Sequence, residues 1–259
     1  MQQFNNRNWI GVWNLYLRET RRFTKVYTQT IIAPVITTLL FLAVFALALG
    51  ALRQDIAGVP FIEFLAPGLI IMAIAQNSFA NTSSSIVISK VQGNIVDTLM
   101  PPFTASELTT AIALGGATRG LVVGLAVTIA MAIFVDLEFK NIFVILFFAF
   151  MASLMLSLIG IIGGIWAEKF DHIAAVTNFI VTPLAFLSGT FYSIERLPEI
   201  AQKVALFNPF FYMIDGFRSG FINYSDSSIF VGSLVLGISN LILWTTCTWM
   251  FYSGYKLKP

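Results

Sequence analysis

Long segments without a charged side chain limit what this chain can fold into more than any other feature. Five such gaps run from Lys25 to Arg53, Glu63 to Lys90, Lys140 to Glu168, Asp171 to Glu195 and Asp226 to Lys256. A sixth, from Glu107 to Asp136, is interrupted only by Arg119. A helix needs about 20 apolar residues to cross a bilayer, and each gap supplies that many. The gaps therefore predict six membrane-spanning helices.

We predict an all-α membrane protein with spans at about 31–52, 64–89, 106–135, 141–166, 173–192 and 228–252. The composition agrees, since 57% of residues are hydrophobic and 11% are charged, against about 45–50% and 25% in soluble domains. A single transmembrane domain over residues 1–259 is expected. The apolar run that ends in "FALALGA" (45–51) is too long and too far along the chain for a secretory leader, so we expect an uncleaved first span.

The basic residues predict the orientation. Positive residues favour the cytoplasmic side of a bacterial plasma membrane, and a cytoplasmic N-terminus places nine of them inside and five outside. Six spans then return the C-terminus to the cytoplasm. The inner set is Arg7, Arg18, Arg21, Arg22, Lys25, Lys90, Lys169, Lys256 and Lys258, and the outer set is Arg53, Lys140, Arg196, Lys203 and Arg218.

The segment before the first span is also expected to be helical. In residues 8–25, Trp9, Val12, Trp13 and Tyr16 recur at helical spacing beside a cluster of basic residues, which is typical of a helix in the membrane interface. A purely topogenic basic flank with anchoring tryptophans fits the same residues.

The outer loop at about 193–227 carries two short amphipathic stretches, which we expect to be re-entrant helices. Asn208 caps the second of them and Pro209 opens it. Tyr212 lies one turn further along this helix. Asp215 and Arg218 stand at i, i+3, where they are able to form an ion pair inside the membrane. An exposed pair on an interfacial helix is the alternative.

Chemistry-bearing motifs are scarce. The dipeptide Gly-Lys does not occur, so a P-loop is absent from this sequence, and neither a G-x-S-x-G nor an H-E-x-x-H motif is present. One cysteine, Cys247, and one histidine, His172, argue against a metal cluster. We therefore predict no catalytic residue, no metal site and no cofactor bound by this chain.

Polar groups inside the spans allow two interpretations. Asn77, Asn81, Ser84 and Ser85 lie on or beside one face of the second span. They form either a substrate pathway or ordinary hydrogen-bonding contacts between helices. Arg119 is the only charged candidate within the membrane, and we expect it to lie near the inner interface with its side chain extended to the headgroups.

A short helix interrupts the chain between the second and third spans. Asn94 is a candidate cap, and proline ends the helix because it cannot extend one and also restricts the residue before it. We expect Ile95, Val96, Leu99 and Met100 to form one apolar face, with Asp97 and Thr98 pointing elsewhere. A groove on a soluble partner or the lipid surface is able to receive that face. The prolines are Pro101 and Pro102.

Several stretches, in this order and spacing, resemble permease subunits of the ABC-2 family of ATP-binding-cassette exporters, which includes polysaccharide, nodulation-factor and daunorubicin-type exporters. The most specific are "TPLAFLSGTFYSIERLP" at 182–198 and "NPFFYMIDGFRSGF" at 208–221. The others are "PG" at 67–68, "VDTLMPPFTASEL" at 96–108 and "AEKFDHIAAV" at 167–176.

The resemblance implies that residues 94–100 form a coupling helix that docks into a partner ATPase. It also implies a dimer, most simply of two identical copies, with two ATPase subunits that hold the ATP and magnesium. The substrate is then expected to be a lipid, a lipid-linked glycan or a hydrophobic drug. From another class, a non-transporting scaffold or channel subunit that recruits a cytoplasmic regulator also fits the residues.

Overall fold

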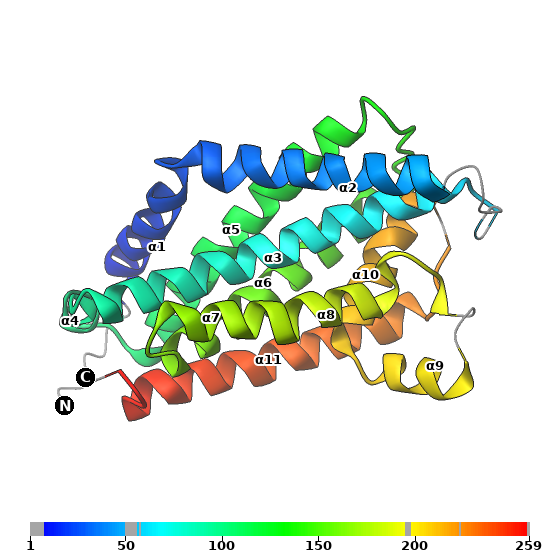
Figure 1. Cartoon of the computed structure of the whole chain (residues 1–259). Coiled ribbons are helices and arrows are strands. Elements are labelled where there is room, and N and C mark those ends of the chain that lie inside the picture. Colours follow the sequence, from blue (N-terminus) through cyan, green and yellow to red (C-terminus); the bar gives the residue numbers. More distant parts are fainter. Residues whose placement is uncertain (1–7, 50–55, 57, 195–197, 223, 258–259) are drawn as a thin grey trace.

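The computed structural model describes residues 8–49, 56, 58–194, 198–222 and 224–257. Arg7, Arg53, Arg196 and Lys258, which contribute to the predicted charge asymmetry, lie outside these residues. Within them the secondary structure is helical, apart from an isolated antiparallel β-bridge between Ile56 and Val59. Figure 1 shows long helices side by side in one bundle.

The prediction of six spans is confirmed. Six helices of the described chain are long and apolar enough to cross a membrane. The third predicted span is too long, because its helix ends at Met131 and Phe134 and Val135 turn back onto the Met131 carbonyl. The six are Thr28–Ala48 (α2 and the π-helical turn before it), Phe61–Val91 (α3), Ala105–Met131 (α5), Ile142–Trp166 (α6), Phe170–Thr190 (α7 and α8) and Ile229–Ser253 (α11).

The other helices are short. Helix α1 (Trp9–Thr24) precedes the first span, α4 (Ile95–Leu99) joins the second to the third, and α9 (Glu199–Leu206) and α10 (Pro209–Ile222) precede the last. Helices α1 and α4 and the end of α11 lie at one end of the bundle, while α9 lies at the other (Figure 1). This arrangement agrees with an even number of crossings between the two ends of the described chain.

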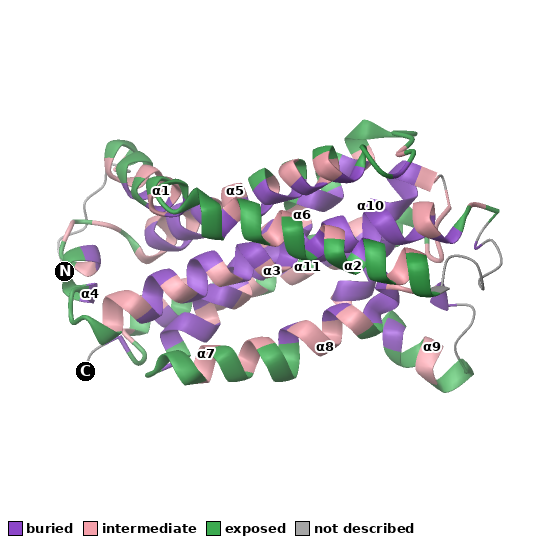
Figure 2. Ribbon diagram, turned by 45° about the horizontal axis from the view of Figure 1, so that its top comes forward, coloured by how far each residue is buried: buried purple, intermediate pink, exposed green. Residues whose placement is uncertain are grey.

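Helix α3 forms the centre of the bundle, as the buried residues along its length show in Figure 2. It packs chiefly against α5 and α6. The three helices approach closely because small residues meet there: Ser78 of α3 and Ser153 of α6 share a hydrogen bond of 2.7 Å beside Gly120 of α5. Small side chains are a common basis of helix packing in membranes.

Gly120→Ala is expected to lower the thermal stability of the purified protein. An added Cβ would lie 1.8 Å from Ser78 Oγ and 2.9 Å from the Ile74 carbonyl oxygen, so α3 and α5 must separate, at a cost of roughly 1–3 kcal/mol. Gly237→Ala is the matched control, because an added Cβ there meets nothing within 4 Å. Equal melting temperatures for the two variants would contradict the close packing.

The fifth span is broken along its length. Pro183 lacks the backbone N–H that continues a helix, and π-helical turns at Thr177–Val181 and Phe186–Thr190 flank α8 (Thr182–Ala185). The helix ends where Ser188 leaves helical geometry and Gly189 takes φ +86°. The end of this span therefore presents backbone carbonyls that need partners from elsewhere.

Helix α10 is buried in the bundle rather than lying on its surface. It packs against α3, α6 and α11, and all its residues from Phe210 to Phe221 are buried. An exposed interfacial helix is therefore wrong for this stretch. Helix α9 is more exposed, with Ile200 and Val204, and Phe207 just after it, open at the surface.

Candidate functional site

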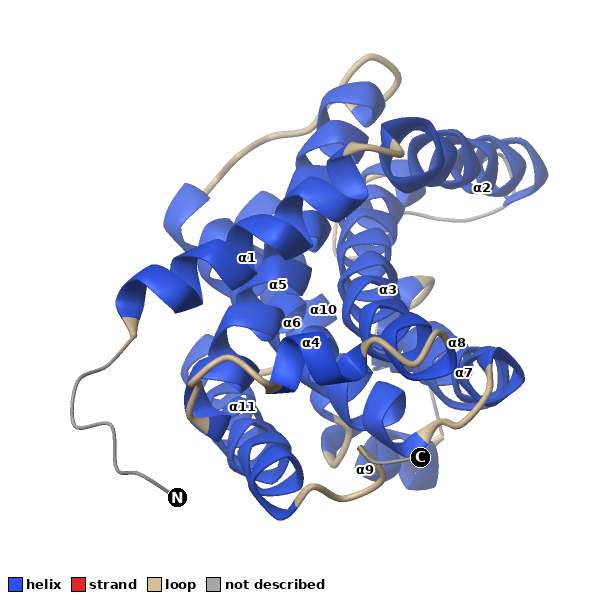
Figure 3. Cartoon of the chain, turned by 90° about the vertical axis from the view of Figure 1, so that its left-hand side faces the viewer, coloured by secondary structure: helices blue, strands red, loops and turns tan. Residues whose placement is uncertain are grey.

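Helix α4 is a short helix at the end of the bundle that contains α1. Gly93 enters it with φ +75°, a conformation that suits glycine, and Pro101 and Pro102 follow its last turn. Asn94 is the N-cap residue of α4, as predicted, but its side chain donates to Gln92 Oε1 and gives the helix no cap bond. Seen end-on, α4 lies across the end of the bundle between α1, α3 and α11 (Figure 3).

The predicted apolar face of α4 is divided. Ile95 and Thr98 are buried and Leu99 is half-buried against the bundle, whereas Val96 and Met100 are 50% and 77% exposed. Thr98 thus points inward, contrary to prediction, because positions i, i+3 and i+4 of a helix share a face. Val96 and Met100, with the exposed Asp97, form the outer face of α4.

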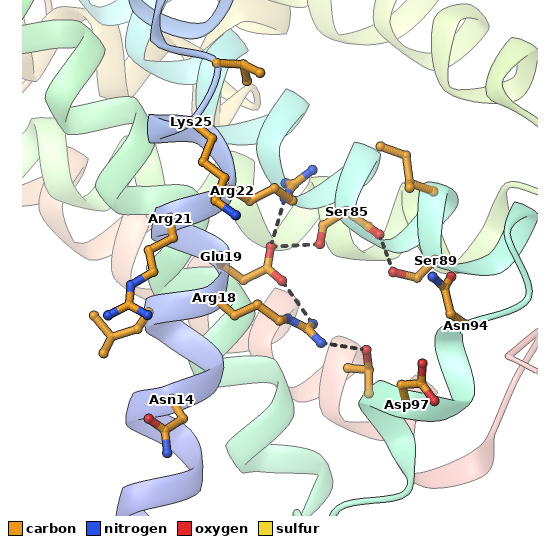
Figure 4. A pocket seen from close by; sticks show the side chains of 14 residues that line it. Asn14, Arg18, Glu19, Arg21, Arg22, Lys25, Ser85, Ser89, Asn94 and Asp97 are labelled. Carbon is orange, nitrogen blue, oxygen red and sulfur yellow. Dashed lines mark hydrogen bonds and ion pairs between the residues drawn. The ribbon is translucent and has the colours of Figure 1, made fainter.

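Two side chains of α1, Arg18 and Glu19, connect α4 to the long helix α3. Arg18 Nη1 donates to Thr98 Oγ1 at 3.1 Å, and its Nη2 lies 3.1 Å from Glu19 Oε1. Ser85 of α3 donates to Glu19 Oε2 at 2.7 Å. The Glu19 side chain is 1% exposed, so a buried carboxylate joins α1 to α3 and holds Arg18, which bonds to α4 (Figure 4).

Arg22 extends the same network along α3. Its Nη2 donates to the carbonyl oxygen of Asn81 at 2.5 Å and to Asn81 Oδ1 at 3.0 Å, and its Nη1 donates to Ser84 Oγ at 3.3 Å. Its Nε lies 3.5 Å from Glu19 Oε2. Burial lowers the pKa of Arg22, and the charge of Glu19 partly opposes that shift.

Arg119 bonds to a side chain of the neighbouring helix α3. It stands about 21 Å along α5 from Ala105 at 1.5 Å per residue, and its Nη2 donates to Asn77 Oδ1 of α3 at 3.1 Å. Its amide partner lies across the contact between α5 and α3, while the place of Arg119 near the inner membrane interface stays a prediction.

All four predicted pathway residues of α3 carry contacts to other helices. Asn77 bonds to α5, and Asn81, Ser84 and Ser85 bond to α1. These contacts match the interpretation as bonding between helices. A role in a pathway stays a prediction. Glu19, which sequence reasoning did not single out, is the lone acid within the basic α1.

A second polar cluster lies at the opposite end, around α10. Arg218 is buried, its Nη2 donates to the carbonyl oxygens of Gly189 at 2.6 Å and Thr190 at 3.2 Å, and its guanidinium stands 3.8 Å from the centre of the Phe64 ring. It therefore satisfies the carbonyls at the broken end of the fifth span and adds a cation–π contact.

Asp215 holds the loop before α11 instead of pairing with Arg218. It accepts from the backbone N–H of Asp226 at 2.8 Å, from that of Ser227 at 3.0 Å, and from the Ser225 and Ser227 hydroxyls at 2.7 and 2.8 Å. The predicted ion pair is absent from the described residues, since each side chain has other partners.

The predicted start of α10 is confirmed. Asn208 Oδ1 accepts from the backbone N–H of Phe210 at 3.0 Å across Pro209, which is the first residue of the helix. Tyr212 donates to the Leu206 carbonyl oxygen at 2.9 Å and so joins α10 to α9.

The end of the bundle near α4 is held by cations that bond to main-chain groups and to an acid. Lys90 donates to the carbonyl oxygens of Ile165 and Ala167, both at 2.6 Å, at the end of α6. Lys256 bonds to Glu168 at 3.0 Å and lowers the pKa of that carboxyl. Among the residues described, no group of His, Cys, Asp and Glu is arranged to hold a metal ion.

Comparison with known proteins gives consistent matches over most of the chain. The model of the ABC-2 type transporter family matches residues 11–222. The inner membrane transport permease YadH of Escherichia coli strain K12 is 32% identical over 250 residues, which are 96% of this chain and 98% of YadH. Nodulation protein J of Neorhizobium galegae is 20% identical over 89% of this chain and 88% of its own length, and that of Rhizobium meliloti is 22% identical over 83% and 81%.

Proposed function

The chain belongs to the ABC-2 family of membrane transport permeases, and from this premise we propose that it is the membrane subunit of an exporter driven by separate ATPase subunits. The observation that supports this most directly is the outer face of α4, where Val96, Asp97 and Met100 are exposed on a helix anchored from behind. A partner protein that binds this outer face would bind a helix whose inner face is fixed to the bundle. ATP and magnesium belong to that partner.

The contacts behind α4 give a route for transmitting force. Thr98 bonds to Arg18 of α1, and Glu19 of α1 bonds to Ser85 of α3, so displacement of α4 is expected to move α1 and the central helix together. Residues 94–100, with Pro101 and Pro102 to end the helix, then act as the coupling segment. ATP-driven closure of two ATPase subunits supplies the displacement.

The complete transporter in this proposal contains two copies of the chain. Each copy contributes part of a pathway between them, with the polar face of α3 at Asn77, Asn81, Ser84 and Ser85 as the candidate lining. The outer residues Pro209, Tyr212, Asp215 and Arg218 form the candidate gate at the opposite end. The name of YadH, an inner membrane transport permease of Escherichia coli, supports a bacterial plasma membrane location.

Substrate class and topology complete the proposal. A lipid, a lipid-linked glycan or a hydrophobic drug is the proposed cargo. Both termini are placed in the cytoplasm, on the side of α4, as the positive-inside rule indicates. A screen of such compounds for stimulation of ATP hydrolysis by the reconstituted complex tests the cargo directly.

Met100→Arg is expected to reduce co-purification of the ATPase subunit at least tenfold. Burying a new charge in an interface costs several kcal/mol unless it is paired, and Met100 is exposed, so the substitution leaves the bundle intact. Leu99 is a poorer choice because it already packs against the bundle. The measurement is the ATPase-to-permease ratio after affinity purification of the tagged permease from membranes in which both are expressed.

Val204→Arg is the control, since Val204 is also largely exposed but lies on α9 at the opposite end. It should co-purify the ATPase as the unmodified chain does. Undiminished recovery of ATPase with Met100→Arg, in a protein that inserts normally, would rule out α4 as the docking helix.

A further inference from the structure

A cavity of about 680 Å³ lies between α1, the end of α3 and α4. Its wall includes Arg21 of α1 and Lys25 just after that helix, Ser89 of α3, and Asn94 and Asp97 at α4, as Figure 4 shows. It therefore lies directly beside the network that connects α4 to the bundle.

The cavity is strongly basic. Four cationic side chains line it against two carboxylates, which leaves an excess of two positive charges. The Glu19 carboxylate is already bound by Arg18, Arg22 and Ser85. Within the described chain, Arg21 and Lys25 have no acid within ion-pair distance, so these two cations are available to a ligand. The cationic residues are Arg18, Arg21, Arg22 and Lys25.

The position of α1 indicates where a ligand would come from. Trp9, Ile10 and Trp13 are exposed on this helix, and tryptophan beside basic residues is typical of a helix at headgroup depth. Apolar side chains of Leu17, Val26 and Ile88 line the cavity together with the cations. The cavity thus combines a basic interior with an apolar margin, as the boundary between a lipid headgroup and its acyl chains requires.

We propose that this cavity binds the phosphate headgroup of an anionic membrane lipid, with Arg21 and Lys25 as the cations that contact the phosphate. Arginine and lysine are the side chains that bind phosphate most strongly in proteins, and basic pockets beside membrane helices bind anionic headgroups. Headgroup binding does not depend on the proposed ATPase partner, and its test uses the permease alone.

The test measures binding of dioctanoyl phosphatidylglycerol to the purified full chain in neutral detergent. The same lipid with a choline headgroup and inorganic phosphate are the comparison ligands. Arg21→Gln with Lys25→Gln is expected to weaken phosphatidylglycerol binding roughly 25-fold, since each cation near an anionic headgroup contributes roughly fivefold. Lys140→Gln with Lys203→Gln removes the same charge at the other end of the bundle and should bind as the unmodified chain does.

A neutral variant separates the cavity from general attraction of charge. Ser89→Trp places an indole ring in the cavity while keeping all four cations, and it should weaken binding. Unchanged binding by Ser89→Trp, or equal weakening by the two charge-matched double variants, would overturn the site. Equal affinity for phosphatidylcholine would show that the net negative charge of the lipid does not determine binding. Equal affinity for inorganic phosphate would assign the site to a soluble anion instead of a lipid.

Discussion

Arg218→Met is expected to lower the stability of the protein more than any other single substitution considered. It leaves the carbonyl oxygens of Gly189 and Thr190 without their donor and removes the cation over the Phe64 ring. Each buried polar group left unpaired costs roughly 1–3 kcal/mol, so the sum is roughly 2–6 kcal/mol. The fifth span then loses the contact that holds its broken end against α10.

The measurement is the temperature at which the detergent-solubilised protein loses its monodisperse peak in size-exclusion chromatography. Lys203→Met, which removes an exposed cation from the neighbouring α9, should leave that temperature unchanged. Arg218→Lys should be intermediate, because lysine keeps the charge without the planar fork of arginine. If Arg218→Met and Lys203→Met melt together, the guanidinium does not hold the end of the fifth span.

Glu19→Ala is expected to produce the second largest loss, concentrated at the α4 end of the bundle. Without the carboxylate, Arg18 and Arg22 face each other uncompensated and Ser85 loses its acceptor. Removal of one partner from a buried ion pair costs about 3–5 kcal/mol. Both arginines here are partly exposed, so roughly 2–3 kcal/mol is expected.

Hydrogen–deuterium exchange of the membrane-embedded protein locates the effect. Backbone amides of α1 and α4 should exchange faster in Glu19→Ala, while those of α10 should be unchanged. Glu138→Ala removes an exposed carboxylate that is paired with Lys140, and it should leave exchange in α1 and α4 as it is. If the α1 and α4 amides of Glu19→Ala exchange as slowly as those of the unmodified chain, then α1 is held by its apolar contacts alone.

The short helix between the second and third spans shows which structural features the local sequence is enough to predict. Proline stops a helix through its own ring, without help from distant residues, so the end of α4 follows from Pro101 and Pro102. Which side of α4 faces the bundle depends on α1, which is remote in sequence. Arg18 bonds to Thr98 across 80 positions, and Thr98 therefore turns inward although its residue type suggested otherwise.

The charged residues inside the bundle likewise have partners that the local sequence does not predict. A spacing of i, i+3 made a pair of Asp215 and Arg218 feasible, but the broken fifth span offers carbonyls to Arg218 and the 225–227 loop offers donors to Asp215. Arg119 likewise meets Asn77, 42 positions away. Such partners come from segments that only the assembled bundle brings together.

The number of spans, their approximate ends and the all-α class followed from the sequence alone, because apolar length against bilayer thickness is a local property of each segment. The tertiary structure decided the partners of Glu19, Arg119, Asp215 and Arg218 and the outer face of α4. A buried polar group must find a partner somewhere in the membrane interior, and the packing of the helices decides which one lies within reach.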